Sequence, residues 1–222
     1  VNCGICALAA KNPVKAELHS WPKTTKPWQR IHVDYAGPFT GHKFLVTVDA
    51  YSKYPEIFRM ASTTLLATTR TLRRLSAHYG LPETLVTDNR TQFSSYDLQQ
   101  FCTSNRICHI FSPFYHPQSN GQEERFVDTF KRTMHKLKRE GTVPEIMDTF
   151  LGTYRTTPNA SLPEHRTPAE LFLRRSPRTS LDLLKPPPAQ PLERDSKMEQ
   201  QFNRRRGARS RQFEIGDTIY VR

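Results

Sequence analysis

Apolar and polar residues alternate in several short segments of the chain, a pattern typical of half-buried β-strands. In the first of them, Ile31, Val33 and Tyr35 alternate with the polar neighbours His32 and Asp34. Three strands in meander order are predicted, with the turn AYSKYP between the second and the third, and two further strands follow. The segments are 30–37, 43–60 with two strands, 84–89, and 107–113.

Apolar residues repeat at helical spacing in the segments that separate and follow the strands. One stripe stops at the helix-ending sequence GLP and consists of Leu65, Leu72, Leu75 and Tyr79. The predicted helices span 63–80, from Ser94 or Ser95 to about Asn105, from about Asn120 to Glu140, 143–157, and 167–175, the last opened by Thr167 and Pro168. Strands in meander order followed by alternating helices and strands predict an α/β fold, with a mixed sheet covered on both faces.

The third predicted helix opens with two adjacent glutamates, Glu123 and Glu124. Its apolar stripe consists of Phe126, Val127, Phe130, Met134 and Leu137. At about 100° per residue, Glu123 falls on the centre line of this stripe, whereas Glu124 lies about 100° away from it. Glu124 therefore belongs to the exposed shoulder of the helix, in line with Lys131, His135 and Lys138.

The chain of 222 residues has a formal charge of +12, which attracts polyanions and makes nucleic acid the first partner to consider. Charge alone also leaves open a basic protein that binds no nucleic acid. No run of about 18 apolar residues exists, and residues 1–20 lack the apolar core of a signal peptide. We therefore expect a soluble, intracellular protein with no membrane partner.

The four cysteines are too few and too unevenly placed for a disulfide framework. Cys102 and Cys108 lie in a predicted helix and a predicted strand, where buried structural thiols are expected. Cys3 and Cys6 have the Cys-x-x-Cys spacing with which one turn binds a zinc ion, so they predict half of a zinc site completed upstream of Val1. Two unpaired thiols are the alternative.

Beyond the last predicted helix, KPPPAQP predicts a stiff spacer and NRRRGARSRQ a solvated, disordered segment. The final residues, FEIGDTIYVR, predict the start of a β-hairpin. The expected organisation is a zinc-module remnant, a main domain, a Pro-rich and basic linker, and a truncated β-module, at residues 1–20, 21–175, 176–211 and 212–222.

Three acids lie where an open sheet presents its ligand crevice, at strand ends and helix starts. Asp34 is late in the first predicted strand, Asp88 ends the fourth, and Glu124 opens the third helix. Each acid taken alone is also compatible with an ordinary turn or cap residue. For Asp49 and Glu56 we expect turn and edge-strand roles.

Four segments together resemble the catalytic core of retroviral and retrotransposon integrases, most closely those of gypsy-type long-terminal-repeat elements. They are HVDYAGPF, FLVTVDAYSKYPE, GLPETLVTDNRTQF and SPFYHPQSNGQEERFVDTFKRTM, and the resemblance covers about Trp28 to Leu173. It implies a ribonuclease H-like, three-layer α/β/α core and an acidic triad whose second Asp and Glu have thirty-five residues between them. Residues 89–123 supply that number between Asp88 and Glu124, so the spacing and the helix geometry both favour Glu124 over Glu123.

The resemblance also implies a function, a polynucleotidyl transferase that processes DNA 3′ ends and joins them to target DNA. Such enzymes work as multimers, and integration takes place in the nucleus. The triad Asp34, Asp88 and Glu124 would bind two Mg²⁺ or Mn²⁺ ions. Zinc would belong to a complete N-terminal module that contains Cys3 and Cys6. The residues expected to contact DNA are Tyr115, Asn120, Lys131, Lys138 and Arg90.

Two residues depart from the family pattern. Arg90 replaces the usual glycine, so its side chain is expected either to strain the turn after Asp88 or to add a phosphate contact. Glu123 replaces a small or apolar residue. Two other functions stay open: an inactive, domesticated or decayed DNA-binding protein, and a ribonuclease H-type nuclease, which the segment HPQSNG and the thirty-five-residue spacing disfavour.

Overall fold

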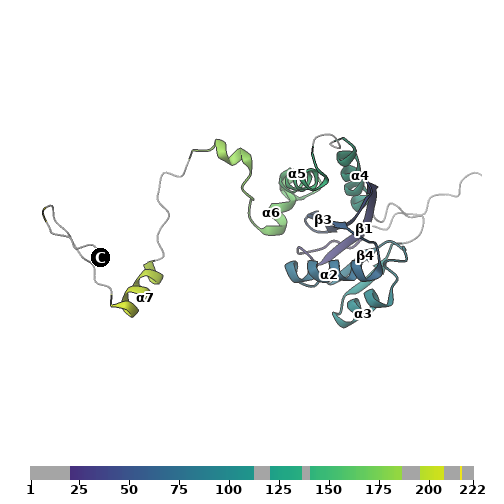
Figure 1. Cartoon of the computed structure of the whole chain (residues 1–222), viewed down its shortest axis with the longest axis horizontal. Helices are drawn as coiled ribbons and strands as arrows, with labels where there is room; N and C mark the ends of the chain where they lie inside the picture. The colour runs from purple at the N-terminus through teal and green to yellow at the C-terminus, as the bar shows by residue number, and fades with distance from the viewer. Residues whose placement is uncertain (1–20, 113–120, 137–140, 187–195, 208–215, 217–222) are drawn as a thin grey trace, which may run out of the picture. The chain divides into compact units, whose positions relative to one another are not determined.

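The structure of the chain is a computed structural model (Figure 1). It describes residues 21–112, 121–136, 141–186, 196–207 and 216, and the side chains of residues 121–124 lie outside that description. The chain divides into two units, Val1–Pro177 and Arg178–Arg222. The boundaries predicted for the four modules stay predictions.

Five strands of the first unit form one mixed sheet in the order β3-β2-β1-β4-β5. Antiparallel pairing joins β1 to β2 and β2 to β3, which is the predicted meander, and parallel pairing joins β1 to β4 and β4 to β5. The mixed five-stranded sheet is therefore confirmed. The strands are β1 (Arg30–Phe39), β2 (His42–Asp49), β3 (Pro55–Met60), β4 (Thr84–Thr87) and β5 (Cys108–Phe111).

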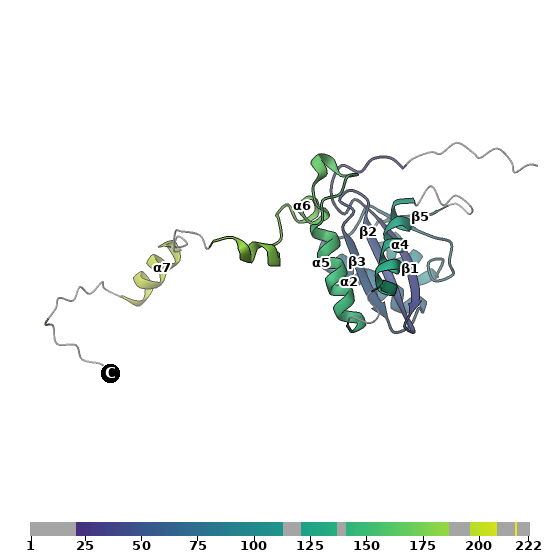
Figure 2. The same cartoon turned by 90° about the horizontal axis from the view of Figure 1, so that it is seen from above.

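Helices cover both faces of this sheet (Figures 1 and 2). One hydrophobic core joins α2 (Leu65–Tyr79) and α3 (Tyr96–Ser104) to the first face. A second core joins α4 (Gly121–Lys136) and α5 (Val143–Thr156) to the other face. The period-2 alternation of the strands supplies apolar side chains to both cores, so the three-layer arrangement predicted above is confirmed.

Helix boundaries follow local capping groups. The side chain of Thr64 accepts a hydrogen bond at the start of α2, and Gly80, with a φ of 87°, ends that helix. Of the two candidate serines, Ser95 caps α3. Thr167 caps the short helix α6 (Pro168–Leu173), which begins with proline as predicted.

Two side chains are more exposed than the sequence pattern predicts. Leu65 is 41% exposed because it lies in the first turn of α2, ahead of the buried positions that begin at Thr68. Cys102 is buried as expected, but Cys108 is exposed. The reason is that β5 is an edge strand and Cys108 is its first residue.

The predicted linker contains helical structure that the sequence interpretation missed. In the second unit, η3 (Ser180–Leu184) and α7 (Ser196–Arg206) are helical, and α7 includes Arg204 to Arg206 of the basic run expected to be disordered. Every residue of α7 is exposed, so the helix depends on the helix propensity of its Lys, Met, Glu, Gln and Arg residues. The first unit also contains the short helical element η2 (Pro163–His165). Within the described ranges, no helix is long and apolar enough to cross a bilayer.

Candidate functional site

Asp34 and Asp88 are neighbours because of the register between β1 and β4. The last parallel pair of these strands joins Val33 to Thr87, and each aspartate is the next residue along its chain. The acid pair, Asp34 and Asp88, therefore lies at the carboxyl end of β4, where open α/β sheets present ligand sites. Asp34 is in the middle of its strand and not late in it, because β1 continues to Phe39 along β2.

The alternation of side chains along β1 places Asp34 on the face covered by α4. Val33 and Tyr35 belong to the core beneath α2 and α3, whereas Ala36 belongs to the core beneath α4 and α5. Residues two apart in a strand share a face, so Asp34 lies on the same face as Ala36. The helix that contains Glu124 covers this face.

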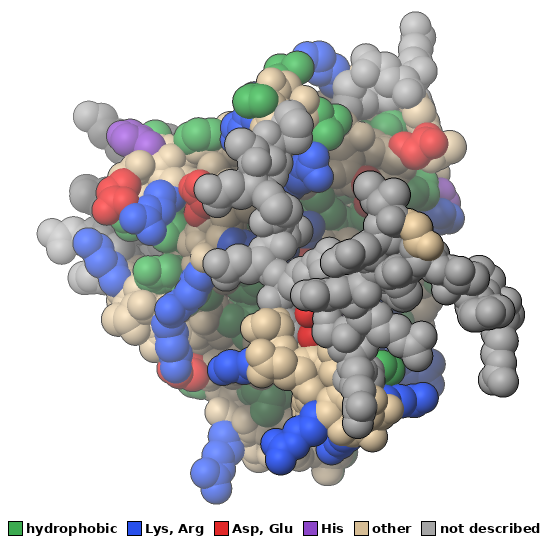
Figure 3. Space-filling view, turned by 90° about the vertical axis from the view of Figure 1, so that its left-hand side faces the viewer, with side chains coloured by type: hydrophobic (Ala, Val, Ile, Leu, Met, Phe, Trp, Pro, Cys, Tyr) green, Lys and Arg blue, Asp and Glu red, His purple; other side chains and the backbone are tan. Residues whose placement is uncertain are grey.

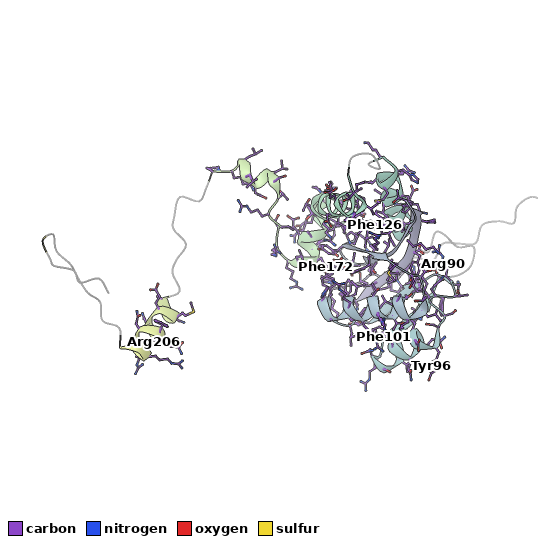
Figure 4. The ribbon with its side chains drawn as sticks, in the orientation of Figure 1. Arg90, Tyr96, Phe101, Phe126, Phe172 and Arg206 are labelled. Carbon is purple, nitrogen blue, oxygen red and sulfur yellow. The ribbon has the colours of Figure 1, made fainter. Side chains whose placement is uncertain are left out.

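Arg90 binds both members of the acid pair. Its Nε is 2.9 Å from Asp88 Oδ2, and its Nη1 is 3.6 Å from Asp34 Oδ1. Nη1 also donates to the carbonyl oxygen of Tyr35 at 3.1 Å, and the backbone N–H of Arg90 donates to Asp88 Oδ1 at 3.1 Å. Arg90 does not adopt a positive φ, so the expectation of a strained turn is wrong. Figure 4 shows Arg90 at this end of the sheet, far from Phe172 at the other end.

The electrostatics of Asp34 are those of a crowded carboxylate. Burial raises the pKa of Asp34 above its ordinary value of 3.8, and the neighbouring carboxylate of Asp88 raises it further. The guanidinium of Arg90, the backbone N–H of Tyr35 and the charge of Lys131 act in the opposite direction without cancelling the rise. The acid pair thus favours a nearby cation, and Lys131 is close enough to influence it.

The turn that presents Asp88 is fixed by two residues that sequence reasoning missed. Asn89 Nδ2 donates to the carbonyl oxygen of Ser112 at 2.6 Å, beyond the end of β5. The backbone N–H and hydroxyl of Ser112 donate to the carbonyl oxygen of Thr87 at 2.8 and 2.9 Å. An Asn directly after a strand-ending Asp was the available signal, because Asn side chains commonly bond to turn backbone.

The described side chains of α4 confirm the predicted apolar stripe except for Leu137, which lies outside the described residues, and Lys131 beside the stripe is exposed. Position 123 is three and seven residues before Phe126 and Phe130, so helix geometry places it on the buried side. Position 124 is seven residues before Lys131 and shares its face. The side chains of both glutamates lie outside the described residues. The buried stripe is Phe126, Val127, Phe130 and Met134.

Several predicted site residues cannot be placed against this geometry. Within the described part of the chain, no three His, Cys, Asp or Glu side chains converge as a metal-binding group. The structure brings together two of the predicted metal ligands, Asp34 and Asp88. The residues or side chains outside the description are Cys3, Cys6, Tyr115, Asn120, Glu124 and Lys138.

Two further acids have the structural roles expected of them. Asp49 is fully buried and accepts hydrogen bonds from Ser52 in the turn after β2. Glu56 lies on the edge strand β3, accepts a hydrogen bond from Tyr79 and pairs with Arg155.

Basic side chains are widely exposed, in keeping with the net charge. Figure 3 shows Lys and Arg side chains at many points of one face of the molecule. On α2, the exposed basic residues include Arg70, Arg73 and Arg74. Such a surface attracts polyanions over distances of about 10 Å at moderate salt.

Comparisons with known sequences agree with this geometry. Residues 24–117 match the sequence model of the integrase core domain. An uncharacterized protein of Caenorhabditis elegans, K02A2.6, is 38% identical over an alignment of 226 residues, which covers 99% of this chain and 18% of that protein. The Pol polyprotein from transposon gypsy of Drosophila melanogaster is 27% identical over 154 residues, which is 68% of this chain and 15% of the polyprotein. The chain spans less than a fifth of both relatives.

Solved structures show the same fold. The integrase catalytic core domain of HTLV-2 in complex with magnesium has a TM-score of 0.54 and 22% identity, covering 66% of this chain and 97% of that one. The intasome of simian T-cell lymphotropic virus in complex with PP2A regulatory subunit B56 gamma has a TM-score of 0.61 and 23% identity. This match covers 79% of this chain and 63% of the chain in that structure. The predicted ribonuclease H-like architecture is therefore confirmed.

Proposed function

Because the chain belongs to the integrase core family found in retroelement Pol polyproteins, we propose that it cuts and joins DNA with Asp34, Asp88 and Glu124 as its catalytic acids. In the proposed reaction, water first attacks a phosphodiester at the 3′ end of the element's DNA. The new 3′-hydroxyl then attacks target DNA, and in each step one P–O bond forms as another breaks. The observation that carries the proposal is the acid pair at the carboxyl end of β4.

The donor set of this site fits a divalent cation that prefers oxygen ligands. Asp34 and Asp88 present carboxylates, and the guanidinium that meets both of them shows that the pair attracts positive charge. We assign two Mg²⁺ or Mn²⁺ ions to Asp34, Asp88 and Glu124. Ions held in this way supply charge neutralisation for the attacking and leaving oxygens of a phosphodiester. The magnesium complex of the HTLV-2 neighbour supports this choice.

The position of α4 supports Glu124 as the third acid. Asp34 lies on the face that α4 covers, and the charge of Lys131 reaches Asp34. Position 124 shares the face of Lys131, whereas position 123 lies on the buried stripe. These relations support Glu124, and not Glu123, as the third acid.

Basic and aromatic residues around the acids are assigned to DNA binding. Lys131 is exposed beside the acid pair, so it is placed to contact a phosphate near the reacting bond. Tyr115, Asn120 and Lys138 are proposed to position the DNA end. Replacing Lys131 with Ala is expected to lower DNA affinity. The slope of log affinity against log salt concentration is expected to become shallower by about one, the contribution of one phosphate contact.

The remaining parts of the chain complete the proposal. Cys3 and Cys6 would supply one half of a zinc site, and residues 212–222 the start of a C-terminal barrel. The neighbouring intasome and the trimeric form of the HTLV-2 core support an oligomer that acts on DNA. Because the proposed substrate includes chromosomal DNA, we place the activity in the nucleus.

Joining of labelled duplex DNA in the presence of Mn²⁺ tests the proposal. Asp88→Asn is expected to lower the rate about a hundredfold or more, while DNA affinity stays within about twofold. The two glutamates provide a matched comparison, because Glu124→Gln and Glu123→Gln differ only in position. We expect the first to abolish joining and the second to keep most of it.

Two results would contradict the assignment in different ways. If wild type and Asp88→Asn bind DNA equally and neither joins strands, the protein is a DNA-binding descendant of an integrase. If Glu123→Gln abolishes joining and Glu124→Gln does not, the third acid has been assigned to the wrong residue.

A further inference from the structure

The guanidinium of Arg90 competes for the oxygens that a metal ion would need. Its Nε contacts one carboxylate of the acid pair and its Nη1 faces the other, so one positive group serves both acids. A cation held by Asp34 and Asp88 has to share these carboxylates with the guanidinium. Two positive charges a few ångströms apart repel strongly in a partly buried site, so both cannot hold the pair at full strength.

The exposure of the Arg90 side chain indicates that its guanidinium can move away from the two carboxylates. Half of its side chain, 50%, is exposed, and ion pairs of exposed side chains are weak. Arg155 at the opposite end of the sheet provides the contrast. Its side chain is 22% exposed, pairs with Glu56 at 2.9 Å and donates through Nε and Nη2 to the carbonyl oxygen of Pro55. Both arginines thus pair with carboxylates and donate to a backbone carbonyl, that of Tyr35 in the case of Arg90, but the side chain of Arg155 is mostly buried and that of Arg90 is half exposed.

We propose that Arg90 is an internal counter-cation of the acid pair, one that competes with the divalent metal and must swing away before the metal binds. This rests on the proposed function for the identity of the metal ligands. In the metal-free protein, Arg90 offsets the repulsion between Asp34 and Asp88. The same contacts lower the affinity of the site for metal, so Arg90 sets the metal concentration at which the site fills.

A Mn²⁺ titration of the 222-residue chain, with free Mn²⁺ measured by its electron paramagnetic resonance signal, tests this competition. Arg90→Gln removes the charge and keeps a polar side chain. We expect its dissociation constant for Mn²⁺ to be about three- to tenfold lower than that of wild type. The metal-free Tm of the variant is expected to fall by about 2 °C, because the two carboxylates lose their counter-charge.

Two variants control for charge. Arg90→Lys keeps the positive charge and is expected to bind Mn²⁺ within about twofold of wild type. Arg166→Gln makes the same change in net charge and also breaks an ion pair, with Glu164, on an exposed segment. It is expected to leave the dissociation constant unchanged, since Arg166 makes its ion pair outside the acid pair.

A second measurement follows the guanidinium itself. The nuclear magnetic resonance signal of the Arg90 Nε–H group can be assigned by its loss in Arg90→Gln. Addition of Mg²⁺ is expected to move this signal toward the position of a solvated arginine, while the signal of Arg155 stays in place. A signal of Arg90 that does not respond while Mg²⁺ binds would show that the guanidinium stays on the acids.

The outcomes separate this inference from the proposed function. Equal or weaker Mn²⁺ binding by Arg90→Gln overturns the competition, even if wild type binds through Asp34 and Asp88. If Asp88→Asn binds Mn²⁺ as tightly as wild type, the acid pair is not the metal site and both proposals fail. Both also fail if neither wild type nor Arg90→Gln binds the ion. Binding by Arg90→Gln alone supports the competition.

Discussion

Asp49, beside the start of β1, and Asp34, within that strand, both have a pKa raised by burial, yet the structure holds their carboxylates in different ways. Both oxygens of Asp49 are engaged. Oδ1 accepts from the backbone N–H of Trp28 at 2.9 Å, and Oδ2 accepts from the backbone N–H and hydroxyl of Ser52 at 2.9 and 2.6 Å. Asp34 makes both its hydrogen bond and its ion pair through Oδ1.

Glu56 lies at the same end of the sheet as Asp49, and Asp88 lies beside Asp34. These two acids are also held in different ways. Glu56 accepts a hydrogen bond from the hydroxyl of Tyr79 at 2.5 Å and pairs with Arg155 at 2.9 Å, with both side chains of the ion pair largely buried. Asp88 pairs with Arg90, whose side chain is half exposed. The side chains that hold Asp49 and Glu56 are thus largely buried. Asp34 and Asp88 each accept a hydrogen bond from one backbone N–H, and the side chain that they share is the half-exposed guanidinium of Arg90.

The end of the sheet that contains Asp49 and Glu56 is called the structural end below. The largest expected effect comes from Asp49→Asn at this end. The amide places an N–H group against either the N–H of Trp28 or the donors of Ser52, because both carboxylate oxygens are acceptors. Leaving buried donors without an acceptor is expected to lower the free energy of unfolding by about 3 kcal/mol. Denaturant unfolding measures the loss.

The exposed acid Asp97, in the first turn of α3, provides the control for this substitution. Asp97→Asn is expected to change the free energy of unfolding by less than about 0.5 kcal/mol. If Asp49→Asn also changed the free energy of unfolding by less than about 0.5 kcal/mol, the buried carboxylate would not stabilise the fold as its contacts indicate.

A smaller loss is expected from Phe172→Ala, which tests the packing around the structural acids. The Phe172 ring lies 4.4 Å from the ring of Tyr54, 5.2 Å from that of Tyr79 and 5.6 Å from that of Trp28, measured between centroids. It thus joins α6 to the end of α2 and to the residues that precede β1 and β3. Because the side chain is only partly buried, we expect a loss of about 2 kcal/mol, below the cost for a fully buried Phe.

Tyr96→Ala makes the same kind of truncation on a side chain that is 73% exposed. This control is expected to cost less than about 0.5 kcal/mol in thermal or denaturant unfolding. Figure 4 labels both aromatic residues. Equal losses of unfolding free energy in Phe172→Ala and Tyr96→Ala would show that the packing of Phe172 does not stabilise the structural end of the sheet.

Tyr79→Phe removes one hydrogen bond from the structural end and leaves the ring in place. Burial and the carboxylate of Glu56 raise the pKa of Tyr79, so the phenol stays protonated and donates to that carboxylate. A hydrogen bond to a charged acceptor in this setting contributes about 1.5 kcal/mol. Tyr35→Phe, which loses a bond to the neutral hydroxyl of Thr68, should cost less in the same unfolding experiment.

Much of the fold could be predicted because its signals are local. Alternation of Ile31, Val33 and Tyr35 identifies a strand, and the spacing of Leu72 and Leu75 identifies a helix, whatever lies elsewhere in the chain. The exposure of Leu65 and Cys108 could not be predicted in this way. It depends on which turn of a helix reaches the sheet and on which strand lies at the edge.

The candidate site could be predicted only in part for a related reason. Asp34 and Asp88 were identified by their places in their segments and by a family resemblance, but the parallel register that brings them together is a long-range property of the sheet. The sequence shows an arginine two residues after Asp88. Whether Arg90 turns back to the acids depends on the turn that Asn89 fixes against β5, which no local pattern specifies.

The smallest expected effect has the opposite sign and comes from Asp34→Asn. Both contacts of Asp34 use Oδ1, so an amide that keeps its oxygen in place retains the hydrogen bond from the N–H of Tyr35, whereas the contact with Arg90 is no longer an ion pair. It also removes a charge that burial and Asp88 disfavour. In the metal-free protein at pH 7, we therefore expect a gain of about 0.5 kcal/mol in the free energy of unfolding, whereas Asp49→Asn gives a loss.

The pH dependence of the Asp34→Asn gain separates charge from packing. The pKa of Asp34 is raised in the folded protein, so its protonated form stabilises the fold fully below the ordinary value of 3.8, and that stabilisation is lost as the pH rises through the folded value. The advantage of the amide over wild type should therefore be present at pH 7 and shrink as the pH falls toward 3.8. A difference that does not change with pH would indicate altered packing, and a loss at pH 7 would mean that Asp34, like Asp49, is an anchor of the fold.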